Sequence, residues 1–275
     1  MSDSVSVDAP GIKAPGIKAS SGVRQGEPWY KNKKLDQYLC FWSVPIFYTL
    51  FGLVFVPLSW MMPPRSPDSS MAEIVAFMQS ENLLFACVIL ILSVGLAAVG
   101  NAVYMTQMRR MTVSPAFRFA FMAGSITGPV VGCLFPMFCF GLGAFRPDYD
   151  PEILAMLYDF GYLSFIGCLG CFCLMWSMLG LSILLDKNNI LPKWLGYYTV
   201  WQFVTELFAA TVWIAKTGPF AWDGLLAFWF NMVLYVPWQI IVYFYIYKAI
   251  QNQPEHELPN VLPVKAQPML QGNAL

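Results

Sequence analysis

Six long apolar runs between Leu39 and Tyr247 dominate this chain, and only one formally charged residue, Glu206, lies deep inside any of them. The runs cover approximately residues 39–62, 83–106, 117–145, 160–185, 195–215 and 225–247. Each run provides the roughly 20 residues that a helix needs to cross the ~30 Å hydrocarbon core of a bilayer. We therefore predict an all-α, polytopic membrane protein built as a bundle of six transmembrane helices.

The composition supports this interpretation and limits the function classes. Hydrophobic residues make up 57% of the chain and charged residues only 12%, whereas an ordinary globular protein has about 25% charged residues. The formal net charge is zero, so we expect no nucleic acid as a partner. The single histidine, His256, argues against haem ligation and zinc-protease motifs. Neither a cofactor nor a metal site is expected.

The apolar runs divide the chain into three parts. Residues 1–37 and 251–275 are polar, contain Gly and Pro, and lack periodicity. Both are predicted to be disordered tails that flank a transmembrane domain at 38–250. Residues 71–82, between the first two spans, predict a short interfacial helix.

Lys and Arg residues indicate the orientation in the membrane. Six spans place both tails on one side. Eleven Lys and Arg residues lie near the span ends on that side, whereas the opposite connections hold only Arg65, Arg146 and Lys216. Cytoplasmic segments carry the excess of positive charge. We therefore predict that both termini are cytoplasmic.

Glu206, about halfway along the fifth span, is the main candidate for a binding residue. A carboxylate at the bilayer centre costs on the order of 2.5–3.5 kcal/mol, so it should face the bundle interior. Gln202 lies one turn earlier and Thr205 is adjacent, while Trp213 continues the same helix face. Tyr235 in the sixth span is a candidate partner.

Two residues of the first span, Tyr48 and Thr49, are further candidate partners at a similar depth. Two interpretations remain open for Glu206. In one it exchanges a proton as part of the function, because desolvation favours the neutral carboxyl. In the other it is permanently protonated and makes an interhelical hydrogen bond that only stabilises packing.

The third span contains residues that interrupt or smooth a helix. Gly124, Gly128 and Gly132 form a ridge at intervals of four, which allows another helix to approach closely. Pro129 and Pro136 each remove a backbone donor. Broken helices of this kind build binding sites in transporters, so Pro129 is a candidate site residue. The alternative is that the kinked helix only packs, with the glycines docking a second copy or another membrane protein.

The segment from about 145 to 250 resembles a group of bacterial multi-pass membrane proteins that has no characterised activity. The residues that carry the resemblance are Phe145-Arg146-Pro147-Asp148, Leu191-Pro192-Lys193-Trp194-Leu195-Gly196-Tyr197 and Gly218-Pro219-Phe220-Ala221-Trp222-Asp223-Gly224. The resemblance implies a six-helix fold in the bacterial cytoplasmic (inner) membrane. It implies no chemistry, so it identifies no functional residue.

Three function classes are consistent with these features. The first is binding or transport of a small apolar or amphipathic solute, with Glu206 as a titratable intramembrane group. The second is a membrane-embedded acid–base enzyme, such as an isomerase, that acts on a lipid-like substrate. The third is an accessory subunit of a membrane complex that docks through Gly124, Gly128 and Gly132.

Overall fold

The computed structural model describes residues 32–146, 148–167 and 170–258, with backbone alone for residues 170–172, and its regular elements there are all helical. The α-helices are α1 (Leu35–Leu53), α2 (Met71–Met78), α3 (Glu81–Met108), α4 (Pro115–Pro129), α5 (Phe135–Phe145), α6 (Pro151–Gly167), α7 (Gly170–Leu185), α8 (Lys193–Glu206) and α9 (Phe230–Gln251). Short π-helical turns are η2 (Val54–Leu58), η3 (Val130–Leu134) and η6 (Leu225–Trp229). Short 3₁₀ segments are η4 (Leu207–Trp213), η5 (Gly218–Phe220) and η7 (Glu255–Glu257).

Four helical stretches within the described residues are long and apolar enough to cross a membrane. They are Leu35–Leu58, Glu81–Met108, Pro115–Phe145 and Gly218–Gln251, which correspond to the first, second, third and sixth predicted spans. The all-α membrane protein is thus supported. In the predicted fourth span, Cys173–Leu185 is a shorter apolar helix, and in the fifth, α8 changes to 3₁₀ geometry at Leu207. The count of six crossings stays a prediction.

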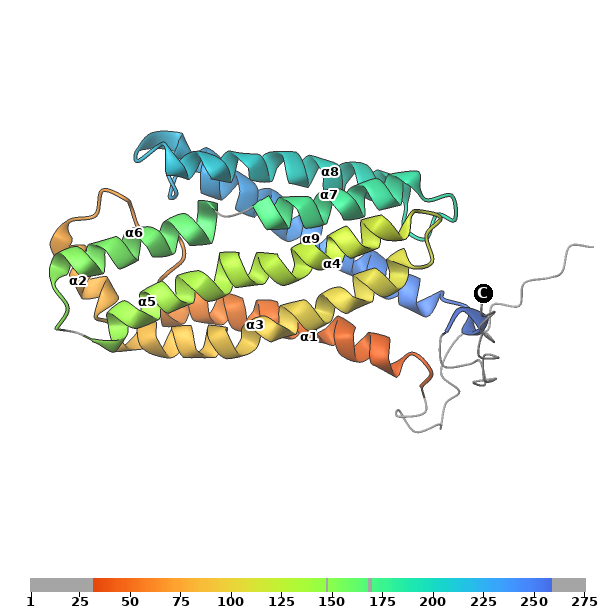
Figure 1. The fold of residues 1–275 in the computed structure, drawn as a ribbon, viewed down its shortest axis with the longest axis horizontal. Coiled ribbons are helices and arrows are strands. Elements are labelled where there is room, and N and C mark those ends of the chain that lie inside the picture. Colours follow the sequence, from red (N-terminus) through yellow and green to blue (C-terminus); the bar gives the residue numbers. More distant parts are fainter. Residues whose placement is uncertain (1–31, 147, 168–169, 259–275) are drawn as a thin grey trace, which may run out of the picture. The chain divides into compact units, whose positions relative to one another are not determined.

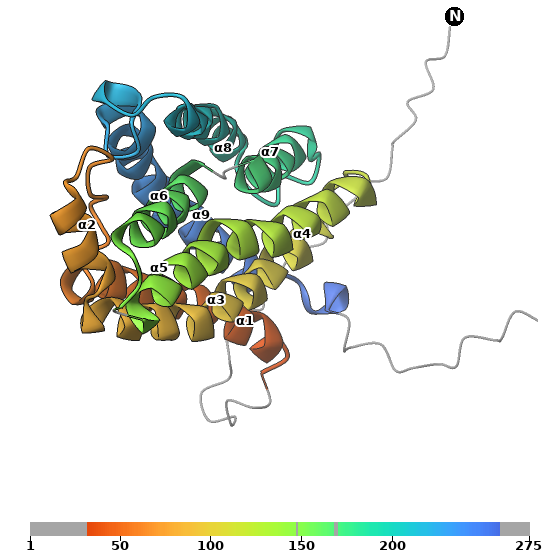
Figure 2. The same ribbon diagram turned by 60° about the vertical axis from the view of Figure 1, so that its left-hand side comes forward.

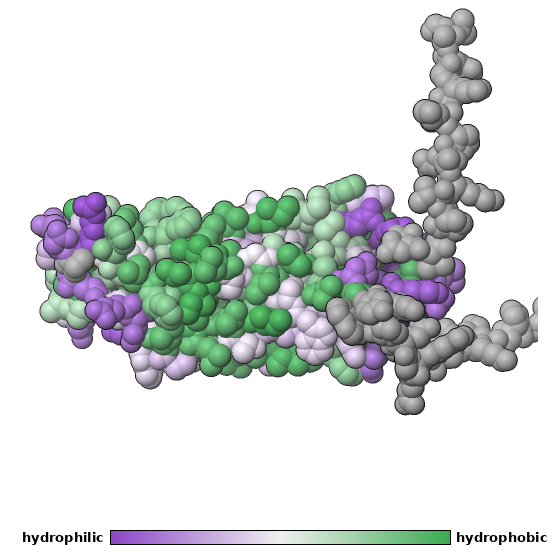
Figure 3. All heavy atoms as spheres, turned by 90° about the horizontal axis from the view of Figure 1, so that it is seen from below, coloured by the Kyte–Doolittle hydropathy of each residue, from purple (hydrophilic) through white to green (hydrophobic). Residues whose placement is uncertain are grey.

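The helices pack side by side in a bundle (Figures 1 and 2), with an apolar band between two polar ends on the face drawn in Figure 3. One end, which we call the clasp end, holds Lys34, Arg110, Asp186 and Ile250. Lys34 Nζ donates to the Ile250 carbonyl at 2.7 Å, so the start of α1 and the end of α9 meet there. The other end, which we call the loop end, holds the connections at 59–70, 148–150 and 214–224.

Close helix contacts in this bundle depend on glycine. A Cβ atom built on Gly100 of α3 would lie 1.7 Å from a methyl group of Val44 on α1. Between α7 and α8, a Cβ on Gly196 would lie 2.9 Å from the Leu184 side chain. Helices in a membrane associate through van der Waals packing, because lipid tails are as apolar as the side chains they would replace. Small residues at the contacts therefore determine which helices pair.

At the loop end, aromatic side chains hold residues 59–70 in place. Trp222 Nε1 donates to the Arg65 carbonyl at 2.6 Å, Tyr158 Oη to the Ser66 carbonyl at 3.0 Å, and Tyr162 Oη to the Met61 carbonyl at 3.2 Å. The predicted short helix follows directly. It is confirmed over Met71–Met78, where it begins with a capping box between Ser70 and Glu73.

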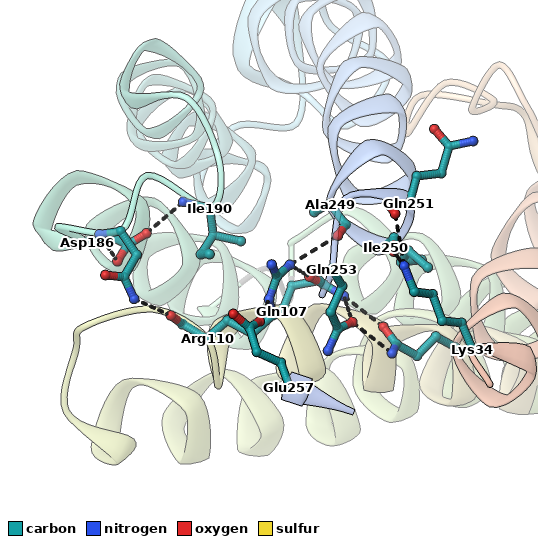
Figure 4. Close-up of polar contacts among 12 residues, drawn as sticks. Lys34, Gln107, Arg110, Asp186, Ile190, Ala249, Ile250, Gln251, Gln253 and Glu257 are labelled. Atoms are coloured by element: carbon teal, nitrogen blue, oxygen red, sulfur yellow. Dashed lines mark hydrogen bonds and ion pairs between the residues drawn. The ribbon is translucent and has the colours of Figure 1, made fainter. Parts of the chain in front are cut away.

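At the clasp end, residues 252–258, which we call the C-terminal clasp, fold back onto the bundle (Figure 4). Gln37 Nε2 donates to Gln253 Oε1 at 2.9 Å, Gln107 Nε2 donates to Gln37 Oε1 at 2.8 Å, and Arg110 pairs with Glu257 at 2.5 Å. Gln253 and Leu258 are buried.

The predicted tail boundaries therefore shift. The bundle begins with α1 at Leu35, inside the predicted tail 1–37, and it includes the clasp, inside the predicted tail 251–275. Sequence polarity did not reveal the clasp because its polar groups find buried partners on other helices. The remainder of both tails, residues 1–31 and 259–275, lies outside the described residues.

Candidate functional site

Glu206 is the last residue of α8, and its side chain lies inside the bundle. The residue is only 9% exposed, Gln202 is completely buried, and Gln202 Nε2 donates to Glu206 Oε1 at 2.8 Å. This contact is the one that the four-residue spacing predicts. Thr205 is also buried, but its hydroxyl donates to the Gln202 carbonyl and so stabilises α8 itself. Thr205 therefore supports the site and does not supply a free donor to it.

Two tyrosines, on α1 and α9, lie within electrostatic range of Glu206. The hydroxyl oxygens of Tyr48 on α1 and Tyr235 on α9 are 2.5 Å apart, and both groups interact electrostatically with Glu206. Tyr48 interacts in the same way with Cys133 of η3. We call these residues, Tyr48, Cys133, Gln202, Glu206 and Tyr235, the Glu206 layer. It joins four parts of the chain that are far apart in sequence.

Regular α-helix is interrupted around this layer. α4 ends at Pro129, the π-helical turn η3 follows with Cys133, and α5 starts with Pro136 in its first turn. α8 passes into 3₁₀ helix directly after Glu206. The third span is therefore one helical stretch with a π-helical turn inside it, and Pro129 lies buried directly before this turn. π-helical turns are frequent at functional sites because they free backbone groups.

Two of the predicted neighbours of Glu206 are wrong. Trp213 is 48% exposed, and its indole N–H donates to the Gly167 carbonyl on the outside of the bundle. The prediction assumed 3.6 residues per turn, but the 3₁₀ segment η4 has about three, so Ala209 and Val212 are the residues buried there. Thr49 is also exposed, because its hydroxyl donates to the Pro45 carbonyl of its own helix.

The structure shows that Tyr235 belongs to a row of polar residues on α9 that the sequence interpretation did not recognise as a row. We call it the α9 row: Asn231, Tyr235, Gln239, Tyr243 and Tyr247, one residue every fourth position. Consecutive members lie about one turn apart and each step advances roughly 40° around the helix, so the row winds gradually around α9. Asn231 and Gln239 are buried, and Gln239 Nε2 donates to Tyr104 Oη of α3 at 3.3 Å. The regular spacing in an apolar span was the available signal.

Three side-chain amide oxygens on α8 and α9 have no hydrogen-bond partner among the described residues: those of Gln202, Asn231 and Gln239. All three residues are buried. A buried acceptor that is left unsatisfied costs about 1–3 kcal/mol. Most buried side-chain polar atoms in proteins have partners, so three orphan acceptors in one interior need an explanation. Their chemistry fits a molecule that brings hydrogen-bond donors.

The glycine ridge of the third span lies within the chain. Gly124, Gly128 and Gly132 are buried, and α4 packs extensively against α7. The ridge thus serves contacts inside one copy of the protein. Docking of a second protein through it stays a prediction and receives no support from this packing.

The comparisons with known proteins identify no family. No protein-family model matches the chain, and searches of curated proteins and of solved structures also found no match. The resemblance to bacterial six-helix membrane proteins therefore stays a prediction. Within the described part of the chain, no group of three or more His, Cys, Asp or Glu side chains is placed to hold a metal ion.

Proposed function

We propose that this protein crosses the bacterial inner membrane six times, with both termini in the cytoplasm, and binds and carries a small amphipathic solute at the Glu206 layer. The observation that carries the proposal is the buried Glu206 carboxyl, whose partner Gln202 has an orphan amide oxygen and whose own helix changes to 3₁₀ geometry at Leu207. An intramembrane carboxyl is rare and is usually functional. The solute would have an apolar body and a hydroxyl or amino group.

In this mechanism Glu206 couples solute binding to the gain and loss of a proton. When it is ionised, its oxygens accept hydrogen bonds only, so a donor on the solute stabilises that form. When Glu206 is protonated, one of its oxygens carries a hydrogen and donates a hydrogen bond. The carboxyl is then a weaker acceptor for the donor group of the solute. Loading and release of the solute would then alternate with loss and gain of a proton at one carboxyl oxygen. The interrupted helices support this scheme because they form natural hinges near the binding layer.

A second candidate function is acid–base catalysis on a lipid-like substrate. The specific observation in its favour is the Tyr48–Tyr235 hydroxyl pair at 2.5 Å, close to Glu206. Glu206 would remove a proton from one carbon of the substrate and return it to another, which moves a double bond without a net redox change. A tyrosine hydroxyl would polarise the substrate. Incubation of the protein with membrane lipids separates the two functions, because only the enzyme changes the lipid composition.

The test uses Glu206→Gln and Glu206→Ala in purified, detergent-solubilised protein. The probes are long-chain alkyl amines and alcohols, and the readout is the shift of the unfolding temperature on binding. We expect stabilisation of the wild type by at least one probe and loss of that effect in both variants. Glu152→Gln, the same change at an exposed carboxyl, is the matched control.

The outcome also decides between the two interpretations of Glu206. If Glu206→Gln binds every probe as the wild type does, the carboxyl acts as a hydrogen-bonding group alone, and the proposed proton exchange is wrong. Equal unfolding temperatures of wild type and Glu206→Gln without a probe would show that lost binding is not lost folding.

A further inference from the structure

The α9 row extends from the Glu206 layer toward the clasp end. From Tyr235 in the Glu206 layer to Tyr247, the row spans twelve residues, which at 1.5 Å per residue is about 18 Å. This length is more than half of the ~30 Å hydrocarbon core. From this geometry we propose that the α9 row is a path for protons between Glu206 and the side of the membrane that holds the clasp. The inference rests on the proposed proton exchange at Glu206.

The first part of the path leads from Glu206 to a cluster of hydroxyl groups. Tyr235 of the row interacts with Glu206 and shares the 2.5 Å contact with Tyr48. Tyr48 in turn interacts with Tyr104 of α3. A tyrosine hydroxyl both donates and accepts a hydrogen bond, so a chain of such groups can pass a proton along.

The second part continues along α9 toward the clasp. Gln239 Nε2 is 3.3 Å from Tyr104 Oη, and the rings of Tyr104 and Tyr243 are 6.0 Å apart. One turn later, the ring of Tyr247 lies 6.0 Å from that of Tyr38 at the start of α1. The path thus reaches the part of the bundle where Lys34 and the clasp are located.

The groups that face the path come from each neighbouring helix. α1 contributes Tyr48, α3 contributes Tyr104, η3 contributes Cys133 and α8 contributes Glu206. Among these facing groups, Glu206 is the single carboxyl, so it is the natural end point for a proton that enters along the row.

A purely structural role does not explain the hydrogen bonding of the row. The Gln239 amide oxygen is buried and has no hydrogen-bond partner among the described residues. The Tyr243 hydroxyl interacts with that of Tyr104, and each of these two groups can donate or accept. The tyrosines of the loop end behave differently: Tyr158 and Tyr162 both donate to carbonyls of the segment 59–70. Hydroxyl groups that contact one another beside a spare acceptor suit a relay, because each hydroxyl can both donate and accept.

The experiment measures how fast the Glu206 proton exchanges with solvent in protein reconstituted into lipid vesicles. Infrared spectroscopy detects the carbonyl band of a protonated carboxyl, and the band that is lost in Glu206→Gln belongs to Glu206. Transfer into D₂O shifts this band as the proton is replaced. We expect Gln239→Leu and Tyr243→Phe to slow the shift by about tenfold or more, equivalent to about 1.4 kcal/mol of barrier.

Tyr158→Phe is the control, because its hydroxyl lies at the loop end. It should leave the exchange rate unchanged. Tyr243→Phe keeps the ring contact with Tyr104 and removes the hydroxyl alone, so its unfolding temperature is measured beside the exchange rate, and slowed exchange at the wild-type unfolding temperature supports the path. A wild-type rate in both Gln239→Leu and Tyr243→Phe overturns the path but leaves Glu206 as a proton-exchanging group. Absence of the Glu206 band in the wild type at every pH overturns the proposed function and the path together.

Discussion

At the scale of single residues, the buried carboxyl groups of Glu206 and Asp186 differ in the number of hydrogen bonds that they accept. Glu206 has one donor, Gln202, in the bundle interior. Asp186, which follows α7 at the clasp end, accepts from the backbone N–H groups of Thr112, Asn188 and Ile190. Burial alone would raise the pKa of Asp186, but these hydrogen bonds lower it below its ordinary value. Asp186 is therefore a fixed anion that ties two connections together.

Replacing Asp186 by Asn tests this role. One oxygen of Asp186 accepts from Thr112 and Asn188, and the other accepts from Ile190. An amide keeps only one acceptor and directs a donor at another donor, so we expect a loss of about 1–3 kcal/mol of stability at neutral pH. Thermal unfolding in detergent measures the loss. Asp68→Asn, at an exposed position, should be neutral.

The pH dependence of this effect has a defined sign. Because folding lowers the pKa of Asp186, its contribution is complete above the unfolded-state pKa, about 3.9, and it disappears as the pH falls through the folded-state pKa. The difference between wild type and Asp186→Asn should therefore shrink below about pH 4. A constant difference down to strongly acidic pH would contradict the assignment.

At the scale of helices, close packing depends on the positions of glycines, which have no side chain. α1 and α3 make the largest helix pair of the bundle, and Gly100 lies at their closest approach to Val44. Val44 is buried and its β-branched side chain has few alternative rotamers. The contact leaves no room for an added methyl group.

Gly100→Ala and Gly95→Ala form a matched pair on α3. The first places a methyl group against Val44 and should cost about 1–3 kcal/mol through overpacking. The second meets nothing within 4 Å, so it should be neutral or stabilise by up to about 1 kcal/mol through helix propensity. Unfolding temperatures of the two variants provide the measurement. Equal destabilisation of the two variants would mean that α3 needs flexibility at both glycines. The contact with α1 would then not determine the cost of the added methyl group.

Helices were easier to predict from the sequence than the neighbours of Glu206. Apolar run length identifies helices because the bilayer imposes it, and Gln202 was found because it shares an α-helix with Glu206. Trp213 was misplaced because the change to 3₁₀ geometry at Leu207 leaves no mark in composition. Tyr48 and Tyr235 are 187 residues apart. Their contact results from tertiary packing, which helical periodicity does not encode.

At the scale of the whole molecule, the number of crossings decides which connections share a side. The predicted fourth span comprises α6 and α7, with α6 ending at Gly167 and α7 beginning at Gly170. If this pair crosses the membrane, the connection at 148–150 and the connection at 186–192 lie on opposite sides. These two connections therefore provide a direct test of the count of six.

Single cysteines at exposed positions in these connections report their sides. Lys187→Cys should react with a membrane-impermeant maleimide only from the cytoplasm, and Asp148→Cys only from the outside. The wild-type protein provides the labelling background, because Cys40 and Cys133 are partly buried and Cys87 and Cys139 are buried. Labelling of both positions from the same side would mean that α6 and α7 do not cross as a pair, and the six-span topology would be wrong.

The clasp also makes assembly depend on the completion of synthesis. Gln37 and its partner Gln253 are 216 residues apart, so their contact can form only after α9 has been made. Until then, the buried amides of Gln37 and Gln107 lack the acceptor that Gln253 provides at the edge of the bundle. A chain that stops within α9 would carry these open polar groups at the membrane surface. Complete and incomplete copies thus differ in whether the polar groups at this end of the bundle have their partners.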